Sequence, residues 1–503
     1  MRFIGKHKLA LLFGFGIIFV YFFTRLYNIL ELPIFTDEAI YVRWAQIAKN
    51  DANWRFISLT DGKQPLLIWL MMIVMRFVED PLLAGRLVST VAGFLTMFGL
   101  FLLGREMFRQ TWVGILSALL YLIYPMAIVY DRMALYDGLV GTFAVWSLYF
   151  AVMLIRKLQL DLALILGMVL GGGVLTKTSG FFNIYLLPTT LVLFDFAQKD
   201  RLKQIIKWAC LAILATILAY MFYSILRLSP FFHIITEKNA IFVYPLKEWI
   251  NHPLEFFVGN WQAFWDWIIR YLTWPLLALA LLSFFLSKAF TREKIVLFLW
   301  FILPILALGL FGRTIYPRFI FFMLLPLLPL IAFSLVNIYT RVKKTYLFAV
   351  FCFLFFFLAL KADYLILNDF AKAHVPESDV IQYVTGWPAG IGIKESIEFF
   401  KKEAKKGKIY IATQGTFGLM PYAFEIYLVN DPNIKVEGYW PIEDKIPARV
   451  IEESKKNPTY FFFYQPCSSC KNIGTAPLPW GNLDIILQFK GETNNYATIY
   501  RIK

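Results

Sequence analysis

Charged residues are scarce in this chain of 503 residues. They make up 17% of the sequence, whereas 59% is hydrophobic and 18% aromatic, and the mean hydropathy is +0.62. A soluble protein of this size would not carry so much apolar surface, so the composition excludes that class and predicts a polytopic membrane protein. The net charge of +15 could suggest nucleic acid binding. However, many of the basic residues occupy short loops between apolar runs, as membrane topology predicts, so we expect no nucleic acid partner.

Cysteine is also rare, with four residues. Cys210 and Cys352 lie inside apolar runs, which favours simple core packing. Cys467 and Cys470 form a single CxxC motif without a second one. We therefore expect a local disulfide if the compartment is oxidising, with a redox or zinc motif as the alternative.

The N-terminal region resembles a signal peptide but lacks a convincing small-residue cleavage site, which predicts an uncleaved first helix. No internal repeat is evident. Charge-free apolar runs long enough to cross a bilayer number eleven, allowing for polar flanks. They are 9–24, 87–104, 110–130, 138–155, 162–176, 178–194, 208–226, 271–287, 295–312, 319–340 and 345–360. The run 64–75 is shorter and contains Pro65 and Trp69, so it predicts a helix lying in the membrane interface.

The distribution of basic residues predicts the orientation. If the N-terminus is cytoplasmic, every alternate loop is basic and the eleven spans leave the C-terminus outside. We therefore expect a multi-pass protein of the cell membrane. Its transmembrane domain would cover 1–361, with outer loops 30–81 and 229–262, and an extracytoplasmic α/β domain would cover 362–503. That second domain contains a helix-like stretch at 394–405 and strand-like stretches at 408–413, 460–465, 483–490 and 497–502.

Asp37 and Glu38 follow the first apolar run almost at once. Ionised carboxylates so close to a bilayer are costly and tend to mark a site. With the predicted topology, further charges at span edges also fall outside. They are Arg25, Lys63, Arg86, Asp131, Arg132, Asp137, Lys177, Glu237, Lys238, Arg313 and Arg318. The positive-inside rule does not predict outer cations, whereas the phosphate of a lipid carrier at the outer leaflet would account for them.

These charges suit sugar transfer from a lipid phosphate. Breaking the bond between C1 and the phosphate oxygen builds negative charge on the leaving phosphate, which cations stabilise. A carboxylate can accept the proton of the incoming hydroxyl or amine, a contribution of roughly 10²–10⁴ in rate.

A family resemblance rests on the order of several short motifs. They are Arg25 with Pro33 and Asp37-Glu38, Lys63-Gln64-Pro65 with Trp69, Arg86-Leu87, Gly104 to Phe108, Arg132 to Asp137, and Arg318-Phe319 with Pro326. This pattern resembles the GT-C membrane glycosyltransferases, and most of all the branch that contains protein O-mannosyltransferases and the lipid A aminoarabinose transferase. The similarity is closest over about 9–195.

The resemblance implies a polyprenyl-phosphate sugar donor and an outward-facing cavity above the membrane. It implies that Asp37 is the catalytic base, Glu38 the second acid of the pair, Lys63 a phosphate ligand and Asp137 a further site acid. We expect Arg25, Arg86, Lys177 and Arg318 to supply the remaining phosphate contacts. In the aminoarabinose branch an acid precedes the lysine and helps bind a metal. Here that position is Gly62, so no metal is expected to be obligatory, although a divalent metal is possible.

Structural interpretations compete with these roles. Asp37 and Glu38 could belong to a solvated helix start capped by Thr36. Lys63 could be an interfacial anchor, and Asp131 could form a local ion pair with Arg132. Two histidines of the outer loop, His233 and His252, could bind a metal with Glu237, although isolated histidines are more often ordinary polar residues.

The sequence therefore predicts a glycosyltransferase that moves a sugar from a polyprenyl-phosphate donor to a protein, lipid or cell-surface glycan acceptor. The alternative from another class is a transporter or flippase of a charged polyprenyl lipid or glycolipid. It would favour repeated halves and charges near mid-membrane, neither of which is seen. A third reading, a polymerase or ligase of surface glycans, differs only in the acceptor.

Overall fold

The computed structural model describes residues 2–342, 344–443, 445–464, 480, 483–491 and 496–503, with residues 2–13 as backbone only. The chain forms two compact units. A helical unit contains Met1–Tyr27, Arg55–Leu67 and Arg86–Pro376. A sheet unit contains Asn28–Trp54, Ile68–Gly85 and Glu377–Lys503.

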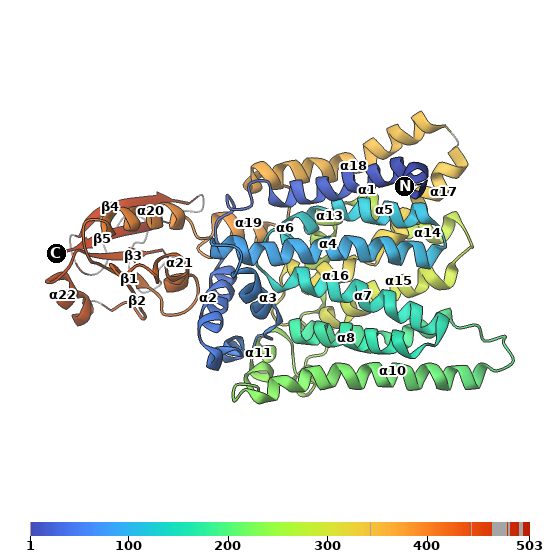
Figure 1. Cartoon of the computed structure of the whole chain (residues 1–503), viewed down its shortest axis with the longest axis horizontal. Coiled ribbons are helices and arrows are strands. Elements are labelled where there is room, and N and C mark those ends of the chain that lie inside the picture. Colours follow the sequence, from blue (N-terminus) through green and yellow to red (C-terminus); the bar gives the residue numbers. More distant parts are fainter. Residues whose placement is uncertain (1, 343, 444, 465–479, 481–482, 492–495) are drawn as a thin grey trace. The chain divides into compact units, whose positions relative to one another are not determined.

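The helical unit is a bundle of long apolar helices. Its helices, some of which extend into the other unit, are α1 (Arg2–Leu26), α4 (Pro81–Phe108), α5 (Thr111–Leu122), α6 (Pro125–Tyr130), α7 (Tyr136–Lys157), α8 (Leu160–Thr176), α9 (Phe181–Tyr185), α10 (Arg201–Ser224), α11 (Ile234–Phe242), α12 (Leu246–Trp249), α13 (Phe257–Leu272), α14 (Trp274–Leu286), α15 (Thr291–Phe311), α16 (Phe321–Leu324), α17 (Leu327–Val342) and α18 (Thr345–Asn368). Figure 1 shows α4, α7, α8 and α10 running side by side. Gly167 and Gly171 of α8 allow close packing, because a Cβ at either position would lie under 3.0 Å from a side chain of α10.

Within the described residues, five of these helices are long and apolar enough to cross a membrane, and up to seven spans result if each of two bent helix pairs counts as one. The other predicted spans fall on apolar helices of 10–17 residues. In the sharper bent pair, α13 meets α14 at 97°. Thr273 has a positive φ of 65° there, and Pro275 starts a new helix because it has no N–H to give to the preceding turn. The predicted polytopic membrane fold is confirmed.

The sheet unit contains a mixed five-stranded sheet in the order β2-β1-β3-β5-β4. Its strands are β1 (Ile409–Gln414), β2 (Ile434–Tyr439), β3 (Thr459–Phe463), β4 (Asp484–Lys490) and β5 (Tyr496–Ile502). The first three are parallel, and β5 runs antiparallel to both β3 and β4. Both β1 and β3 are buried along their whole length, as central strands covered on two faces are.

Helices of the sheet unit come from distant parts of the chain. They are α2 (Thr36–Asn50), α19 (Glu377–Val380), α20 (Ile393–Ala404), α21 (Leu419–Leu428) and α22 (Ala448–Ser454), and α3 (Leu66–Val74) begins in the other unit. The helix α2 packs on α21 through an ion pair, in which Arg43 Nε lies 2.6 Å from Glu425 Oε2. Gln46 Nε2 also donates to the Ile426 carbonyl at 2.8 Å. The predicted C-terminal α/β domain is confirmed in character, and residues 28–54 pack with it.

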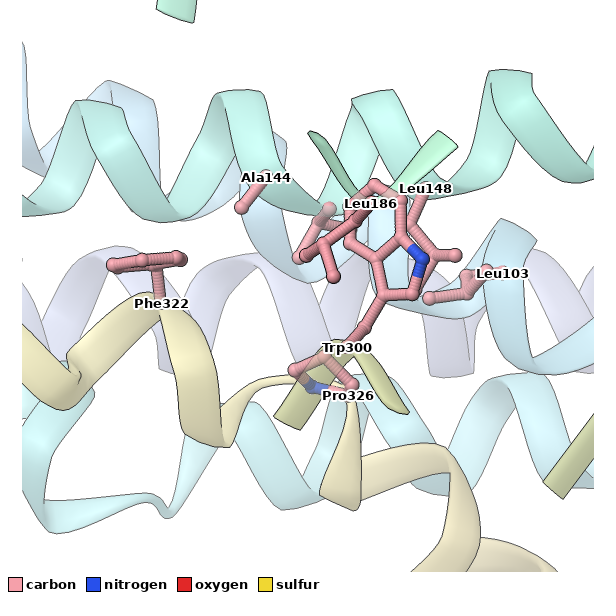
Figure 2. Close-up of a pocket in the computed structure, with 8 residues that line it drawn as sticks. Leu103, Ala144, Leu148, Leu186, Trp300, Phe322 and Pro326 are labelled. Carbon is pink, nitrogen blue, oxygen red and sulfur yellow. The ribbon is translucent and has the colours of Figure 1, made fainter. Parts of the chain in front are cut away.

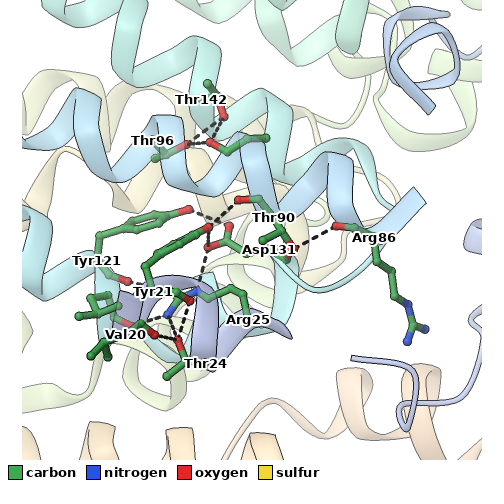
Figure 3. Close-up of polar contacts among 12 residues, drawn as sticks. Val20, Tyr21, Thr24, Arg25, Arg86, Thr90, Thr96, Tyr121, Asp131 and Thr142 are labelled. Carbon is green, nitrogen blue, oxygen red and sulfur yellow. Dashed lines mark hydrogen bonds and ion pairs between the residues drawn. The ribbon is translucent and has the colours of Figure 1, made fainter. Parts of the chain in front are cut away.

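A fully buried ion pair joins α1 to the turn after α6. Arg25 Nε lies 3.3 Å from Asp131 Oδ2 (Figure 3). The same carboxylate accepts hydrogen bonds from the hydroxyls of Tyr21 at 3.0 Å and Tyr121 at 2.8 Å. A Cβ at Gly93 of α4 would lie 2.2 Å from the Asp131 carboxylate, so only glycine leaves it room. The pair therefore fixes where three helices meet.

We expect Asp131→Ala to lower the thermal midpoint of the purified protein sharply. The substitution leaves the Arg25 charge buried without its partner, a situation that costs about 3–5 kcal/mol. The matched control is Arg109→Ala, because the Arg109 side chain is 59% exposed in its pair with Glu106, and ion pairs that face solvent contribute about 0–1 kcal/mol. Equal thermal midpoints for the two variants would contradict this structural role.

Candidate active site

Two predicted phosphate ligands of the helical unit lie over one pair of aromatic rings. Lys63 Nζ is 5.1 Å from the ring centroid of Phe242, and Lys177 Nζ is 4.4 Å from that of Phe319. The two rings touch edge to face with their centroids 5.8 Å apart. Because the face of an aromatic ring attracts cations, this pair holds two ammonium groups in one region.

Arg318 belongs to the same cluster. Its guanidinium lies 4.8 Å from the ring centroid of Tyr316 and 5.9 Å from that of Phe319. Pro317 begins the short 3₁₀ helix η6 (Pro317–Ile320) that places this arginine beside the aromatic pair. We call Lys63, Lys177 and Arg318 the cation cluster.

Gln64 connects the segments that carry the two lysines. Its Nε2 donates to Thr178 Oγ1 at 2.8 Å, just after Lys177, and its carbonyl accepts from the Tyr136 hydroxyl at 2.8 Å. Gln64 is buried. Since buried hydrogen bonds hold their partners rigidly when both groups are satisfied, the distance between the two lysine segments is fixed by this side chain.

Asp137 lies in the first turn of α7 and pairs with Lys177. Its Oδ1 is 2.8 Å from Lys177 Nζ. The carboxylate is buried, and the positive end of the helix dipole stabilises it. Lys177 ends α8 in extended backbone, so the ion pair decides where its ammonium points. The cluster thus gathers three cationic side chains, and a carboxylate positions one of them.

Arg25 serves the buried network instead of the cation cluster. Its Nε faces Asp131, its Nη1 donates to the Leu122 carbonyl at 2.7 Å and its Nη2 donates to the Tyr121 carbonyl at 3.2 Å. Asp131 therefore pairs with Arg25 and not with its neighbour Arg132. The guanidinium of buried Arg86 points away from this network (Figure 3).

The acidic pair opens α2 in the sheet unit. Glu38 is buried, and its Oε2 accepts from the Phe35 backbone N–H at 3.1 Å, which caps the helix. Thr36 does not cap the helix, because its Oγ1 donates to the Pro388 carbonyl at 3.0 Å. Asp37 is half-buried. The two acids thus belong to the sheet unit, whereas the cation cluster belongs to the helical unit.

Gly62 has a reason to be glycine. Its φ is +65°, and a Cβ there would lie 2.6 Å from Lys238 Cβ and 2.7 Å from the Ile234 carbonyl oxygen. The neighbouring Asp61 is paired with Lys238 Nζ at 2.6 Å. An acid at position 62, as the aminoarabinose branch has, would not fit without a shift of the backbone.

Within the part of the chain that the structure describes, no group of three or more His, Cys, Asp or Glu side chains is arranged to hold a metal. His233 Nδ1 contacts the Pro230 carbonyl at 3.0 Å, and exposed His252 lies 3.9 Å from Glu255. Cys467 and Cys470 lie outside the described residues.

An apolar pocket opens further along α7, between α4, α15 and α16 (Figure 2). It is lined by Leu103, Ala144, Val145, Leu148, Leu186, Trp300, Phe322 and Pro326. The indole N–H of Trp300 donates to Thr189 Oγ1 at 3.0 Å. Because none of these lining residues is charged, the pocket has no group for acid–base chemistry.

The Lys177–Asp137 pair gives a testable coupling. We expect Lys177→Met and Asp137→Asn each to lower the thermal midpoint, and the double variant to lose less than the sum, because each single change strands a partly buried group. A coupling of about 0.5–3 kcal/mol is typical of contacting residues. The same cycle on Lys394 and Glu31, an exposed pair, should show nearly additive losses. Additive losses at Lys177 and Asp137 as well would argue against the observed pair.

The chain is similar to known membrane glycosyltransferases in one segment of its sequence and in its fold. Residues 62–223 match the family model described as dolichyl-phosphate-mannose-protein mannosyltransferase. No curated protein matches the sequence. The crystal structure of ArnT from Cupriavidus metallidurans bound to undecaprenyl phosphate aligns over 98% of both chains, at 14% identity and a TM-score of 0.58. The archaeal oligosaccharyltransferase AglB from Archaeoglobus fulgidus, with an inhibitory peptide and a dolichol-phosphate, aligns over 92% of this chain and 70% of its own, at 12% identity and a TM-score of 0.55.

The ArnT alignment extends over the residues of both units, so the helical bundle and the sheet each have a counterpart in that protein. The family match covers the segment from Gly62 to Tyr223, which contains Lys63, Asp137 and Lys177. The predicted resemblance to the GT-C glycosyltransferases is confirmed. Over residues 62–223 the chain is thus similar to the dolichyl-phosphate-mannose-protein mannosyltransferase family of membrane glycosyltransferases, and its fold is ArnT-like.

Proposed function

We propose that the protein takes a sugar from a polyprenyl-phosphate donor and transfers it to an acceptor on the outer face of the membrane. The observation that carries this proposal is the cation cluster: two lysines and an arginine gathered over Phe242 and Phe319, with one lysine aimed by Asp137. The family match supports the class of reaction.

In this proposal the cation cluster binds the donor phosphate. Lys63, Lys177 and Arg318 supply charged N–H donors, and charge-assisted hydrogen bonds to phosphate are stronger than neutral ones. Because negative charge grows on the phosphate as its bond to the sugar breaks, the same contacts strengthen toward the transition state. Asp137 positions Lys177. Arg86 stays a predicted phosphate ligand, and Arg25 has a supporting role in holding α1.

Asp37 is the proposed general base. The acceptor hydroxyl attacks C1 of the sugar, its proton passes to the Asp37 carboxylate, a new glycosidic bond forms, and the bond from C1 to oxygen breaks so that the polyprenyl phosphate leaves with both electrons. Glu38 holds the backbone that carries this base, because its carboxylate is engaged with the Phe35 N–H. We propose no obligatory metal.

The basic residues of alternate loops support a cytoplasmic N-terminus and an extracytoplasmic sheet unit. ArnT has been captured with undecaprenyl phosphate and AglB with a dolichol-phosphate and a peptide, which supports a lipid phosphate as donor here. Protein, lipid and glycan acceptors are all compatible with the chemistry of Asp37.

The role of Asp37 predicts a large loss of activity. We expect Asp37→Asn to lower sugar release from polyprenyl-phosphate sugars by roughly 10²–10⁴, because the amide cannot accept the proton. The measurement incubates purified protein in lipid with a panel of radiolabelled donors. Asp266→Asn is the control, since Asp266 is an exposed acid paired with Arg270. Wild-type turnover by the Asp37 variant would refute the assignment, and lipid movement without any sugar release would indicate a flippase.

If the cation cluster binds the donor phosphate, variants that lack one of its charges should turn over the donor more slowly. We expect Lys63→Ala and Arg318→Ala each to reduce turnover by a factor on the order of 10², the scale for removing one stabilising donor from developing charge. Lys238→Ala, a lysine paired with Asp61 instead, is the matched control. If both cluster variants turn over like the control, the phosphate does not bind at these residues.

A further inference from the structure

The carboxyl edge of the sheet unit has the geometry of a ligand site. Because β2, β1 and β3 are parallel, their carboxyl ends meet at one edge. After β1 the chain passes through α21 to β2, which lies on one side of β1. The next strand after β3 in the chain, β4, lies on the opposite side of the sheet, beyond β5. Open sheets with helical crossovers bind ligands outside the carboxyl ends of strands, where the chain leaves in opposite directions. Here that point lies between β1 and β3.

The loop that carries the proposed base is held at this same edge. The backbone N–H and the Oγ1 of Thr36 both donate to the Pro388 carbonyl, each at 3.0 Å. The same two segments are joined a second time, because the Gly390 N–H donates to the Ile34 carbonyl at 2.8 Å. A Cβ on Gly418, in the loop after β1, would lie 3.7 Å from Thr36 Cγ2. Asp37 follows Thr36 in the first turn of α2, so this turn lies beside the loop that follows β1.

Exposed aromatic rings lie in the loops at this edge. Phe417, in the loop after β1, is 49% exposed, and its ring centroid lies 6.2 Å from that of Trp44 in α2. Trp440 follows β2 and is 54% exposed. The Gly415 N–H donates to the Tyr439 carbonyl at 2.7 Å, which joins the ends of these two strands. Large apolar rings left in water at one edge indicate a surface that binds something.

Trp387, which is 39% exposed, extends the aromatic edge toward β3. It lines a small pocket with Ala389, Ile391, Leu419, Tyr464, Tyr496 and Ala497. Burial raises the pKa of Tyr464 to about 12, so its hydroxyl keeps its proton at physiological pH. The edge thus offers flat rings together with a neutral hydroxyl.

Three of the segments at this edge carry no charge. Residues 386–392, 414–421 and 438–442 contain no Asp, Glu, Lys or Arg, in a chain that is 17% charged. A phosphorylated or strongly charged acceptor would find no charged partner in these three segments. Flat aromatic rings with hydrogen-bonding groups at their margin match the alternately apolar and hydroxylated surface of a sugar.

We propose that the aromatic edge formed by Trp387, Phe417 and Trp440 binds the acceptor, and that the acceptor is a neutral saccharide. This inference rests on the proposed function, since it places the attacking sugar hydroxyl beside Asp37. The edge binds the sugar rings, and the hydroxyl loses its proton to Asp37 as it forms the new bond to C1 and the polyprenyl phosphate departs.

The test separates acceptor binding from the chemistry. Full-length protein in lipid carries Trp387→Ala, Phe417→Ala and Trp440→Ala, singly and together. Trp112→Ala is the control, a ring that is 67% exposed in the helical unit. The probes are neutral oligosaccharides of glucose, galactose, mannose and N-acetylglucosamine. We expect KM for the oligosaccharide acceptor to rise about tenfold in the single variants and further in the triple variant, with kcat and donor hydrolysis to water unchanged.

Direct binding gives a readout that needs no turnover. We expect the Asp37→Asn protein to bind the same oligosaccharides on a glycan array and to lose that binding when the three rings are removed. If wild-type protein releases no sugar from any donor, the proposed function fails, yet the array still tests the edge. Unchanged KM and unchanged array binding in the triple variant would overturn this proposal, and so would binding of unglycosylated peptides in place of oligosaccharides. Restoration by Phe417→Tyr, which keeps the ring, supports stacking and excludes a folding defect.

Discussion

Like charges must be held together beside an apolar medium, and this constraint shapes the helical unit. Lys63, Lys177 and Arg318 repel one another, and the repulsion is strong where water is scarce. Two rings offset it by presenting their faces to the cations, and Asp137 neutralises one of the three charges. The extended residue that ends α8, the turn at Pro317 and the buried amide of Gln64 all serve to keep this arrangement in place.

The same bundle uses buried charge for a second purpose. Arg25 and Asp131 are enclosed between α1, α4 and the turn after α6, and the donors and acceptors around them are satisfied within the network. A buried pair of this kind fixes a unique packing of helices when it is fully hydrogen-bonded. Asp137 and Lys177 have a different character, because their partly exposed lysine can still reach a ligand. One pair holds the scaffold, and the other belongs to the proposed phosphate site.

Much of this architecture can be predicted from local patterns. Apolar runs separated by basic loops indicate the bundle, and the strand-like stretches near 408–413, 460–465, 483–490 and 497–502 correspond to β1, β3, β4 and β5. The strand β2 is not among the predicted stretches, although the alternation of apolar and charged residues in Ile434–Tyr439 is typical of a half-buried strand with one sheet neighbour. Arg25 and Lys63 look alike in sequence, since both are outer cations at span edges. Only tertiary contacts separate the structural arginine from the lysine of the cluster.

The acidic pair shows where sequence reasoning ends. Asp37-Glu38 stands out from its neighbours, but its attachment to Pro388 joins residues about 350 positions apart, which no local pattern contains. The two acids also differ in a way that adjacency hides, because Glu38 is buried as a cap whereas Asp37 keeps part of its side chain in solvent. Glu38 thus holds the start of the helix, and the half-buried Asp37 beside it is the proposed base.

The most direct test of this account is a structure of the protein with a polyprenyl phosphate bound. The account predicts that the phosphate oxygens lie within hydrogen-bonding distance of Lys63 Nζ, Lys177 Nζ and the Arg318 guanidinium, with the Lys177–Asp137 pair intact. A phosphate bound elsewhere, out of hydrogen-bonding reach of all three cations, would contradict it.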